Sequence, residues 1–343
     1  GPEVTFNPEP YLADGLCDYI LRGEGEIAFT KLCDALLEGK DIPDGFGIAY
    51  FDKAARKVVL PEPVVCENLA ELASPYTPDY LAKLPGRIAY VESSRGCPFS
   101  CAFCLSGACR GVRNFPMDFV KRAILLLWRS GVKTVKFIDR TFNADRKRAD
   151  EILRFILEHY PNEPSVSFHF EVAADKLAPT TLALLENAPR GLFQLEAGLQ
   201  SFNPKTLEAV ARHTDLDKLC ENVRRLLASG NAHIHVDLIA GLPYEGFDSF
   251  RDSFNKAYAL HADMLQLGFL KLLYGSALRA DADEYAYVFD ENPPYEIRST
   301  AWLSEKEMDV LHGVENACDR LHNAGRFRQT LAYVLQSAGL EPF

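Results

Sequence analysis

Three cysteines stand close together in the first third of the chain, at Cys97, Cys101 and Cys104. Thiolates at this C-x3-C-x2-C spacing can wrap one face of a cubane iron–sulfur cluster, whose four irons need four ligands. Three protein ligands therefore leave one iron open for a cofactor or a substrate. A structural zinc ion would need a fourth protein ligand, and Cys109 is the available candidate for that position.

The elements that must position these cysteines follow from the periodicity of the apolar residues. Strands are predicted at residues 87–92, 134–139, 165–172, 192–199, 233–239 and 264–272. Helices are predicted at residues 117–129, 146–159, 180–186, 216–228, 247–260 and 304–322. This alternation predicts a parallel sheet with helices outside it. Six units are fewer than the eight of a complete barrel, so we expect an α/β fold with a partial (β/α)6 TIM-like barrel.

The cysteines follow the first predicted strand directly, which places them at the rim where barrel enzymes carry their chemistry. Three later strands have one apolar and one polar face, and the apolar face must meet the helices. The polar faces carry Ser167, His169 and Glu171, then Gln194, Glu196, Gly198 and Gln200, then His233, His235 and Asp237. These inward faces predict a cavity for a polar ligand, with a solvated face of an open sheet as the alternative.

The cysteine motif, read as C-x3-C-x-Phe-C after the first strand of a partial barrel, resembles the radical S-adenosylmethionine (SAM) superfamily. The resemblance implies that the amino and carboxylate groups of SAM chelate the open iron of a 4Fe–4S cluster. An electron from the cluster then splits SAM to methionine and a 5′-deoxyadenosyl radical. In such enzymes the cofactor carries the chemistry, and the protein orients it and excludes water.

Four further segments occur in the order expected for that superfamily: residues 168–171, 196–201, 211–214 and 236–243. They resemble the SAM-holding strands of anaerobic coproporphyrinogen dehydrogenase and of cobalamin-type radical SAM enzymes. The resemblance implies that a set of polar residues holds the amino acid and ribose of SAM, namely Glu171, Glu196, Gln200, Arg212 and Asp237. It also implies that Phe103 and Gly241 lie near the adenine.

The end of the second predicted strand departs from the common pattern of the superfamily, because a glycine-rich motif is absent there. Residues 137–143 instead resemble the cobalamin-type branch. That resemblance implies that Asp139 contacts the amino group of SAM. His233 and His235 can serve either as acid–base groups inside the barrel or in packing and hydrogen bonding.

The two ends of the chain differ from the barrel. Residues 1–70 contain a predicted strand at 18–22 and a predicted helix that ends at Leu37, and they resemble the last part of a Rossmann-like cobalamin-binding domain. A linker rich in Pro and acidic residues is predicted at 43–86, so it begins within this region. The histidine segment that ligates cobalamin in that family would lie upstream, so we expect the chain to be a fragment whose opening residues 1–4 end a strand. The full-length parent could then bind cobalamin.

We therefore predict four divisions: the cobalamin-domain remnant at 1–70, a linker at 71–86, the radical SAM core at 87–275 and a C-terminal region at 276–343. The last region resembles that of an uncharacterised cobalamin-type subgroup with a C-terminal domain of unknown function. We expect it to cover the barrel mouth and to help select the substrate.

The composition and net charge of the chain limit the kinds of binding partner and the compartment that we expect. The chain has 343 residues, 48% of them apolar, and a net charge of −11, which argues against nucleic acid as the main partner. No apolar run reaches 18 residues, so we expect no membrane span. Nine cysteines, an odd number, favour a reducing compartment, and we expect a cytoplasmic protein.

The leading hypothesis is a cobalamin-type radical SAM enzyme, such as a methyltransferase acting on a small molecule, with a flavodoxin or ferredoxin as electron donor. A radical SAM oxidoreductase that decarboxylates or dehydrogenates a tetrapyrrole is the alternative within the enzymes. A tRNA methylthiotransferase is weaker, because the tail lacks the basic character of an RNA-binding module. A zinc-binding structural module is the alternative outside the enzymes.

Overall fold

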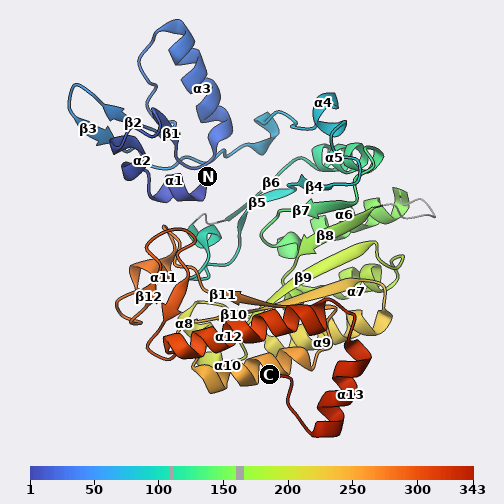
Figure 1. The fold of residues 1–343 in the computed structure, drawn as a ribbon. Helices are drawn as coiled ribbons and strands as arrows, with labels where there is room; N and C mark the ends of the chain where they lie inside the picture. The colour runs from blue at the N-terminus through green and yellow to red at the C-terminus, as the bar shows by residue number, and fades with distance from the viewer. Residues whose placement is uncertain (109–110, 160–165) are drawn as a thin grey trace.

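The computed structural model describes residues 1–108, 111–159 and 166–343. All six predicted strands are present and form one parallel sheet, which confirms the predicted α/β fold (Figure 1). The strands are β4 (Ile88–Val91), β7 (Thr134–Phe137), β8 (Ser167–Glu171), β9 (Phe193–Gln200), β10 (His233–Ala240) and β11 (Met264–Phe269). Their order is β11-β10-β9-β8-β7-β4, so consecutive strands are neighbours and the partial barrel has β4 and β11 at its edges.

Helices connect successive strands along the sheet. They are α5 (Met117–Arg129), α6 (Arg146–His159), α7 (Pro179–Glu186), α8 (Pro204–Ala209), α9 (Leu216–Ser229) and α10 (Phe247–Tyr258), with short 3₁₀ turns η3 (Phe142–Ala144) and η4 (Ala174–Lys176). Their apolar residues and the outer faces of the strands make one core, in which Phe168 and Phe170 are fully buried. The opposite faces of the strands are polar, as the sequence pattern predicts, and they line the inside of the barrel.

A β-hairpin that the sequence analysis did not predict carries the cysteine loop. It consists of β5 (Ser94–Cys97) and β6 (Gly111–Asn114), which pair antiparallel, with the 3₁₀ turn η2 (Leu105–Ala108) between them. Cys109, the candidate fourth zinc ligand, lies outside the described residues. The hairpin begins three residues after β4 ends, so it stands at the carboxyl edge of the sheet.

The N-terminal region contains α1 (Pro2–Phe6), α2 (Glu9–Ala13), β1 (Tyr19–Leu21), α3 (Gly25–Glu38), β2 (Ile48–Asp52), β3 (Lys57–Val59), η1 (Leu69–Glu71) and α4 (Pro78–Leu81). The predicted strand and helix, β1 and α3, are both present. The expectation that residues 1–4 end a strand is wrong, because Pro2 opens a helix, where its missing N–H costs nothing.

The expected linker at residues 43–86 is also more ordered than predicted. Its first part forms β2 and β3, and the Asp52 carboxylate accepts hydrogen bonds from Ala54 N and Ala55 N in the turn between them. Strands β1, β2 and β3 pair antiparallel, which differs from the parallel pairing of a Rossmann-like sheet. The assignment of this region to a cobalamin-binding domain stays a prediction.

The C-terminal region contains α11 (Ala277–Ala280), β12 (Val288–Phe289), β13 (Ile297–Ser299), α12 (Glu305–Cys318), the π-helical turn η5 (Asp319–Asn323) and α13 (Arg328–Ala338). The predicted helix at 304–322 therefore corresponds to α12 and η5, and α13 was not predicted. A capping box between Ser304 and Glu307 fixes the start of α12. Helix α12 packs along β11, and α13 projects from the body of the molecule (Figure 1).

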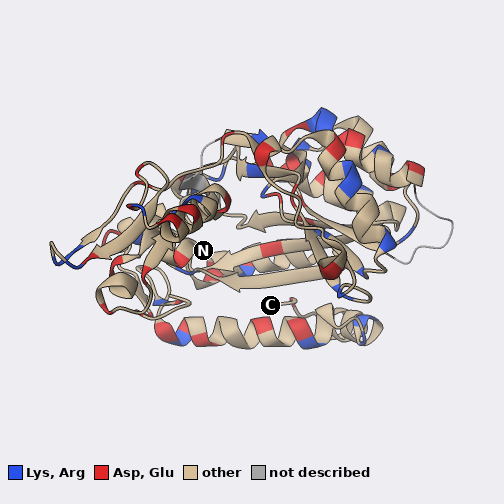
Figure 2. Ribbon diagram, turned by 90° about the horizontal axis from the view of Figure 1, so that it is seen from above, with Lys and Arg blue, Asp and Glu red and all other residues tan. Residues whose placement is uncertain are grey.

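Charged residues are spread over the surface. Lys and Arg alternate with Asp and Glu along the helices (Figure 2). Within the described residues, no helix combines the length and apolarity needed to cross a lipid bilayer.

A buried carboxyl group ties together the connections that follow β9 and β10. Ser201 Oγ and Ser253 Oγ both donate hydrogen bonds to Glu245 Oε1, at 2.7 and 2.9 Å, while Oε2 has no hydrogen-bond partner within the described part of the chain. Glu245 is 0% exposed. Burial raises its pKa to about 7, although the two serine hydroxyls oppose the shift.

We predict that Glu245→Gln stabilises the protein at pH 8 by about 3 kcal/mol and at pH 5 by about 1 kcal/mol or less. The pKa of this group is higher in the folded than in the unfolded chain. Its neutral form therefore favours folding below pH about 4, and that contribution is lost as the pH rises to about 7. Denaturant unfolding at both pH values measures the difference. The exposed Glu158→Gln is the control, and equal effects of Glu245→Gln at pH 5 and pH 8 would contradict the prediction.

Candidate functional site

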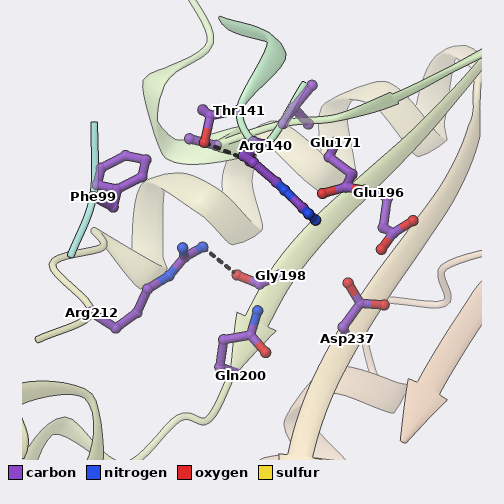
Figure 3. Close-up of a pocket in the computed structure, with 11 residues that line it drawn as sticks. Phe99, Arg140, Thr141, Glu171, Glu196, Gly198, Gln200, Arg212 and Asp237 are labelled. Atoms are coloured by element: carbon purple, nitrogen blue, oxygen red, sulfur yellow. Dashed lines mark hydrogen bonds between the residues drawn. The ribbon is translucent and has the colours of Figure 1, made fainter. Parts of the chain in front are cut away.

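A polar cavity of about 130 Å³ opens at the carboxyl ends of β7 to β10 (Figure 3). Its lining is Phe99, Arg140, Thr141, Glu171, Val172, Ala173, Glu196, Gly198, Gln200, Arg212 and Asp237. Carboxyl ends of parallel strands meet at one edge of a sheet, so residues far apart in the sequence converge there. The cavity brings together five of the residues predicted to hold SAM: Glu171, Glu196, Gln200, Arg212 and Asp237.

The cysteine loop lies directly beside this cavity. Cys97 Sγ is 3.5 Å from Thr141 Oγ1, and Arg212 Nη1 is 4.0 Å from Cys101 Sγ, so two lining residues also contact cysteines. Cys101 is 7% exposed, and burial raises the pKa of its thiol while the Arg212 guanidinium opposes that shift. Hydrogen bonds from Ala102 N to Val210 O and from Leu278 N to Ala102 O attach the loop to the barrel and to helix α11 of the C-terminal region.

Three carboxylates stand on one side of the cavity (Figure 3). Burial, together with the neighbouring Glu196 and Glu171 carboxylates, raises the pKa of Asp237 to about 7. Burial and the charge of Glu196 likewise raise the pKa of Glu171. A hydrogen bond from His169 Nε2 at 3.0 Å lowers the pKa of Glu196, so Glu196 is the most readily ionised of the three.

Arg212 and Gln200 face these carboxylates across the cavity (Figure 3). Arg212 Nη2 donates to Gly198 O at 2.9 Å, and its ring-facing guanidinium lies 5.7 Å from the centre of Phe99. Gln200 has a φ of +67°, in the left-handed region, which turns its side chain over Gly198. A Cβ atom on Gly198 would lie only 2.1 Å from Gln200 Nε2, so the Gln200 side chain can lie over position 198 only while that residue has no side chain.

Several buried polar atoms around the cavity lack a hydrogen-bond partner within the described residues: Arg212 Nε, Gln200 Oε1 and Asp237 Oδ1. A buried polar atom without a partner destabilises the protein by about 1–3 kcal/mol, so such atoms are typical of a ligand site. A guanidinium donor suits a carboxylate, and carboxylate acceptors suit an ammonium or ribose hydroxyls. The residues present therefore fit SAM, and three thiols on the adjacent loop fit a cluster with one open iron.

Asp139 occupies a different environment from the one predicted. Its carboxylate accepts from Ser93 N at 2.9 Å, from Ser93 Oγ at 2.6 Å and from Ser94 Oγ, and only 1% of the residue is exposed. Both oxygens are engaged inside the protein, so the structure gives Asp139 a role in joining the ends of β4 and β7. The predicted contact between Asp139 and SAM gains no support from this position.

The two residues predicted near the adenine, Phe103 and Gly241, are not among the residues that line the cavity. Phe103 packs against the hydrophobic core, while Phe99 of the same loop lines the cavity. Gly241 has a φ of +90° and lies under Ile297, and a Cβ atom there would be 1.8 Å from Ile297 Cδ1. Close packing against the C-terminal region therefore accounts for glycine at position 241.

Sequence reasoning missed five cavity residues, namely Phe99, Arg140, Thr141, Val172 and Ala173. Arg140 and Thr141 directly follow the strand end at Asp139, so their place at the carboxyl edge was available as a signal. The place of Phe99 depends on how the loop between Cys97 and Cys101 folds over Arg212. No local sequence pattern predicts the contact between Phe99 and Arg212.

A network of charges joins the cysteine hairpin to the N-terminal region. Arg95 Nη1 and Arg113 Nη1 lie 3.1 and 3.0 Å from Glu24 Oε2, and Arg95 Nε is 2.9 Å from Glu92. The Glu24 side chain is 19% exposed. Burial opposes ionisation of Glu24, but hydrogen bonds from Arg113, Cys66 N and Arg95 hold its pKa below the ordinary value.

This combination of a partial barrel, a cysteine loop at its carboxyl edge and a polar cavity beside that loop defines an α/β-barrel protein built to hold a metal cluster and a polar cofactor. A family model described as the radical SAM superfamily matches residues 91–257, which span the cysteine loop and β7 to β10. The chain belongs to the radical SAM superfamily, whose members use a 4Fe–4S cluster and SAM. A second model, described as a protein of unknown function (DUF4080), matches residues 283–343.

Curated relatives include methyltransferases. An uncharacterised methyltransferase of Pyrococcus horikoshii is 30% identical over 276 residues, covering 78% of this chain and 58% of the relative. The cobalamin-dependent radical SAM methyltransferase TokK of Streptomyces tokunonensis is 28% identical over 284 residues, covering 73% of this chain and 38% of TokK. The chain thus spans about half the length of these relatives or less.

Solved structures share the fold. The cobalamin-dependent SAM radical enzyme OxsB matches with a TM-score of 0.70 at 16% identity, over 98% of this chain and 55% of OxsB. The radical SAM methyltransferase TsrM from Kitasatospora setae matches with a TM-score of 0.67 at 17% identity, over 89% of this chain and 61% of TsrM. At these identities the likeness concerns the fold.

We predict that Glu24→Gln lowers the free energy of unfolding by about 2 kcal/mol, because the partly buried Arg95 and Arg113 lose a charged acceptor. The same change should speed loss of the reconstituted cluster to an iron chelator by about fivefold or more, since the hairpin opens more easily. Glu38→Gln, in an exposed pair with Lys40, is the matched control and should change neither quantity measurably. A cluster-loss rate equal to that of the unchanged protein would contradict the prediction.

We predict that Gly198→Ala weakens SAM binding to the reconstituted chain by about tenfold, because the new methyl group displaces the Gln200 side chain from its place over the cavity. The cluster content should be unchanged. Calorimetric titration with SAM measures the dissociation constant. Gly313→Ala, on α12 with open space around it, is the control that should leave SAM affinity intact, and full affinity in Gly198→Ala would count against the proposed cavity.

Proposed function

We propose that this chain cleaves SAM reductively at a 4Fe–4S cluster and uses the resulting radical chemistry in methyl transfer to a small molecule. The observation that carries the proposal is the contact of the cysteine loop with a cavity whose buried guanidinium, amide and carboxylate atoms lack partners in the described part of the chain. Membership in the radical SAM superfamily supports the same conclusion.

In this proposal Cys97, Cys101 and Cys104 hold the cluster. Arg212 binds the carboxylate of SAM, because its guanidinium reaches both the cavity and the thiol of Cys101. The remaining polar lining, Glu171, Glu196, Gln200 and Asp237, accepts from the ammonium group and the ribose hydroxyls. When bound, the cluster and SAM supply an electron and a carbon radical, and the protein's part is to orient them and to exclude water.

Methyl transfer is supported by two curated relatives that are described as methyltransferases, one from Pyrococcus horikoshii and one from Streptomyces tokunonensis. These relatives support neither the tetrapyrrole oxidoreductase nor the zinc-binding structural module. Cobalamin enters the proposal because TokK and OxsB are described as cobalamin-dependent.

The domain divisions at 1–70, 71–86, 87–275 and 276–343 are part of the proposal, with the last one covering the barrel mouth. The cluster needs an external reductant, for which we propose a flavodoxin or a ferredoxin. None of the eight cysteines in the described ranges forms a disulfide, which supports a reducing compartment such as the cytoplasm.

We predict that the anaerobically reconstituted and reduced chain gives the paramagnetic resonance signal of a 4Fe–4S cluster, and that adding SAM shifts this signal. Cys97→Ala should abolish the signal because one of three thiolate ligands is lost. Cys17→Ala, which removes a cysteine in the N-terminal region, is the matched control and should keep the signal and its shift. Failure to take up iron, or a signal indifferent to SAM, would overturn the proposal.

The products of the same reduced sample separate the reaction types. Methyl transfer predicts S-adenosylhomocysteine among the products, and oxidative radical chemistry does not. A sample that forms only 5′-deoxyadenosine and methionine would favour the oxidoreductase instead.

A further inference from the structure

We propose that His169, Glu196 and His235 form a binding site for one divalent transition-metal ion, separate from the three cysteines. One ligand atom from each of these side chains lies within 4.8 Å of the other two. Two imidazoles and one carboxylate form a donor set that binds Zn²⁺ and Fe²⁺ in proteins. The site shares Glu196 with the lining of the SAM cavity, but the proposal does not depend on SAM cleavage.

The fold itself creates this arrangement. His169, Glu196 and His235 occupy inward-facing positions on three adjacent strands, β8, β9 and β10. His235 pairs in register with Glu196, and His169 pairs with Gln194, two residues before Glu196 on the same face of β9. Positions on neighbouring strands are held by the backbone ladder, so the three side chains are preorganised more firmly than side chains on a loop would be.

The hydrogen bonding of the group is incomplete in a way that a metal ion would complete. His169 is 5% exposed, and its Nε2 lies 3.0 Å from Glu196 Oε2. Nε2 of His235 is buried without a hydrogen-bond partner within the described ranges. A buried ring nitrogen left unpaired is costly, and its lone pair is the group that coordinates a metal.

Lys136 is the competing cation. Its Nζ lies 3.6 Å from Glu196 Oε2, and 33% of its side chain is exposed. A partly exposed ammonium at this distance contributes little energy, and its long side chain can move further into solvent. An ion at the three-residue group would therefore replace Lys136 at Glu196 without leaving a buried charge unpaired.

The place of the group suggests what the ion does. Glu196 also lines the polar cavity, so the ion would lie against the wall of that cavity (Figure 3). Three protein ligands leave a coordination position open, as in catalytic zinc sites. That position can accept an oxygen atom of a bound molecule, such as a carboxylate or a hydroxyl group. The cysteine thiols are soft ligands for the cluster, whereas this group offers nitrogen and oxygen.

Zinc uptake by the reconstituted chain tests the proposal, with the cluster in place so that Cys97, Cys101 and Cys104 are occupied. After zinc addition and desalting, elemental analysis should find about one zinc ion per chain. X-ray absorption should show a nitrogen and oxygen shell at about 2.0–2.1 Å rather than sulfur at about 2.3 Å. His235→Gln should weaken zinc binding by about 100-fold or more, because loss of even an outer-shell partner costs about 10–100-fold.

The matched control is His159→Gln, which removes an exposed histidine at the end of α6 and should leave zinc uptake unchanged. His169→Gln is a second ligand variant, and the cluster content of each variant reports whether it is folded. Absence of bound zinc in the unchanged chain, a sulfur shell, or equal uptake by folded His235→Gln would each overturn the proposal. A missing SAM response of the cluster would leave this result unaffected, since zinc uptake requires no SAM.

Discussion

The hydrogen bonds that Ser93 and Ser94 donate to the buried Asp139 carboxylate are the constraint from which the site is built. They join the chain leaving β4 to the end of β7, and they fix the point at which the cysteine hairpin begins. Arg148 holds the base of the hairpin as well, because its Nη2 donates hydrogen bonds to Ser93 O and to Phe115 O, one on either side of the hairpin. Together with the hydrogen bonds made by Ala102, these bonds hold the cysteine loop beside the cavity.

Burial also determines which of the carboxyl groups inside the barrel are ionised. Three carboxylates close together would repel one another, and their desolvation differs enough to separate their protonation states. Glu196 is held ionised by His169, whereas the pKa of Asp237 rises to about 7. Arg140 and Arg212 line the same cavity and offset the negative charge. The cavity is therefore suited to a zwitterionic ligand, which presents both signs of charge at once.

The parts of this protein that could be predicted from its sequence are those set by local periodicity. The helices at 117–129 and 146–159 match residue for residue, and all six sheet strands are present, because alternation with period 2 or 3.6 is a property of neighbouring residues. Contacts between segments far apart in the chain could not be predicted from the sequence. Asp139 was placed at the correct edge of the sheet, but its serine donors lie about 45 residues earlier, and the hairpin around the cysteines depends on them.

The C-terminal region meets the barrel at a position where only glycine fits. Gly241 follows β10 in a left-handed conformation, Ile297 covers its Cα, and Tyr287 Oη donates to its carbonyl oxygen at 3.1 Å. Residues 295–297 also pair with the segment after β11, through bonds from Leu272 N to Tyr295 O and from Ile297 N to Leu270 O. The loops at the carboxyl edge of β10 and β11 are thus held by the C-terminal region itself. A change in that region would therefore alter the rim of the cavity even where it touches no cavity residue.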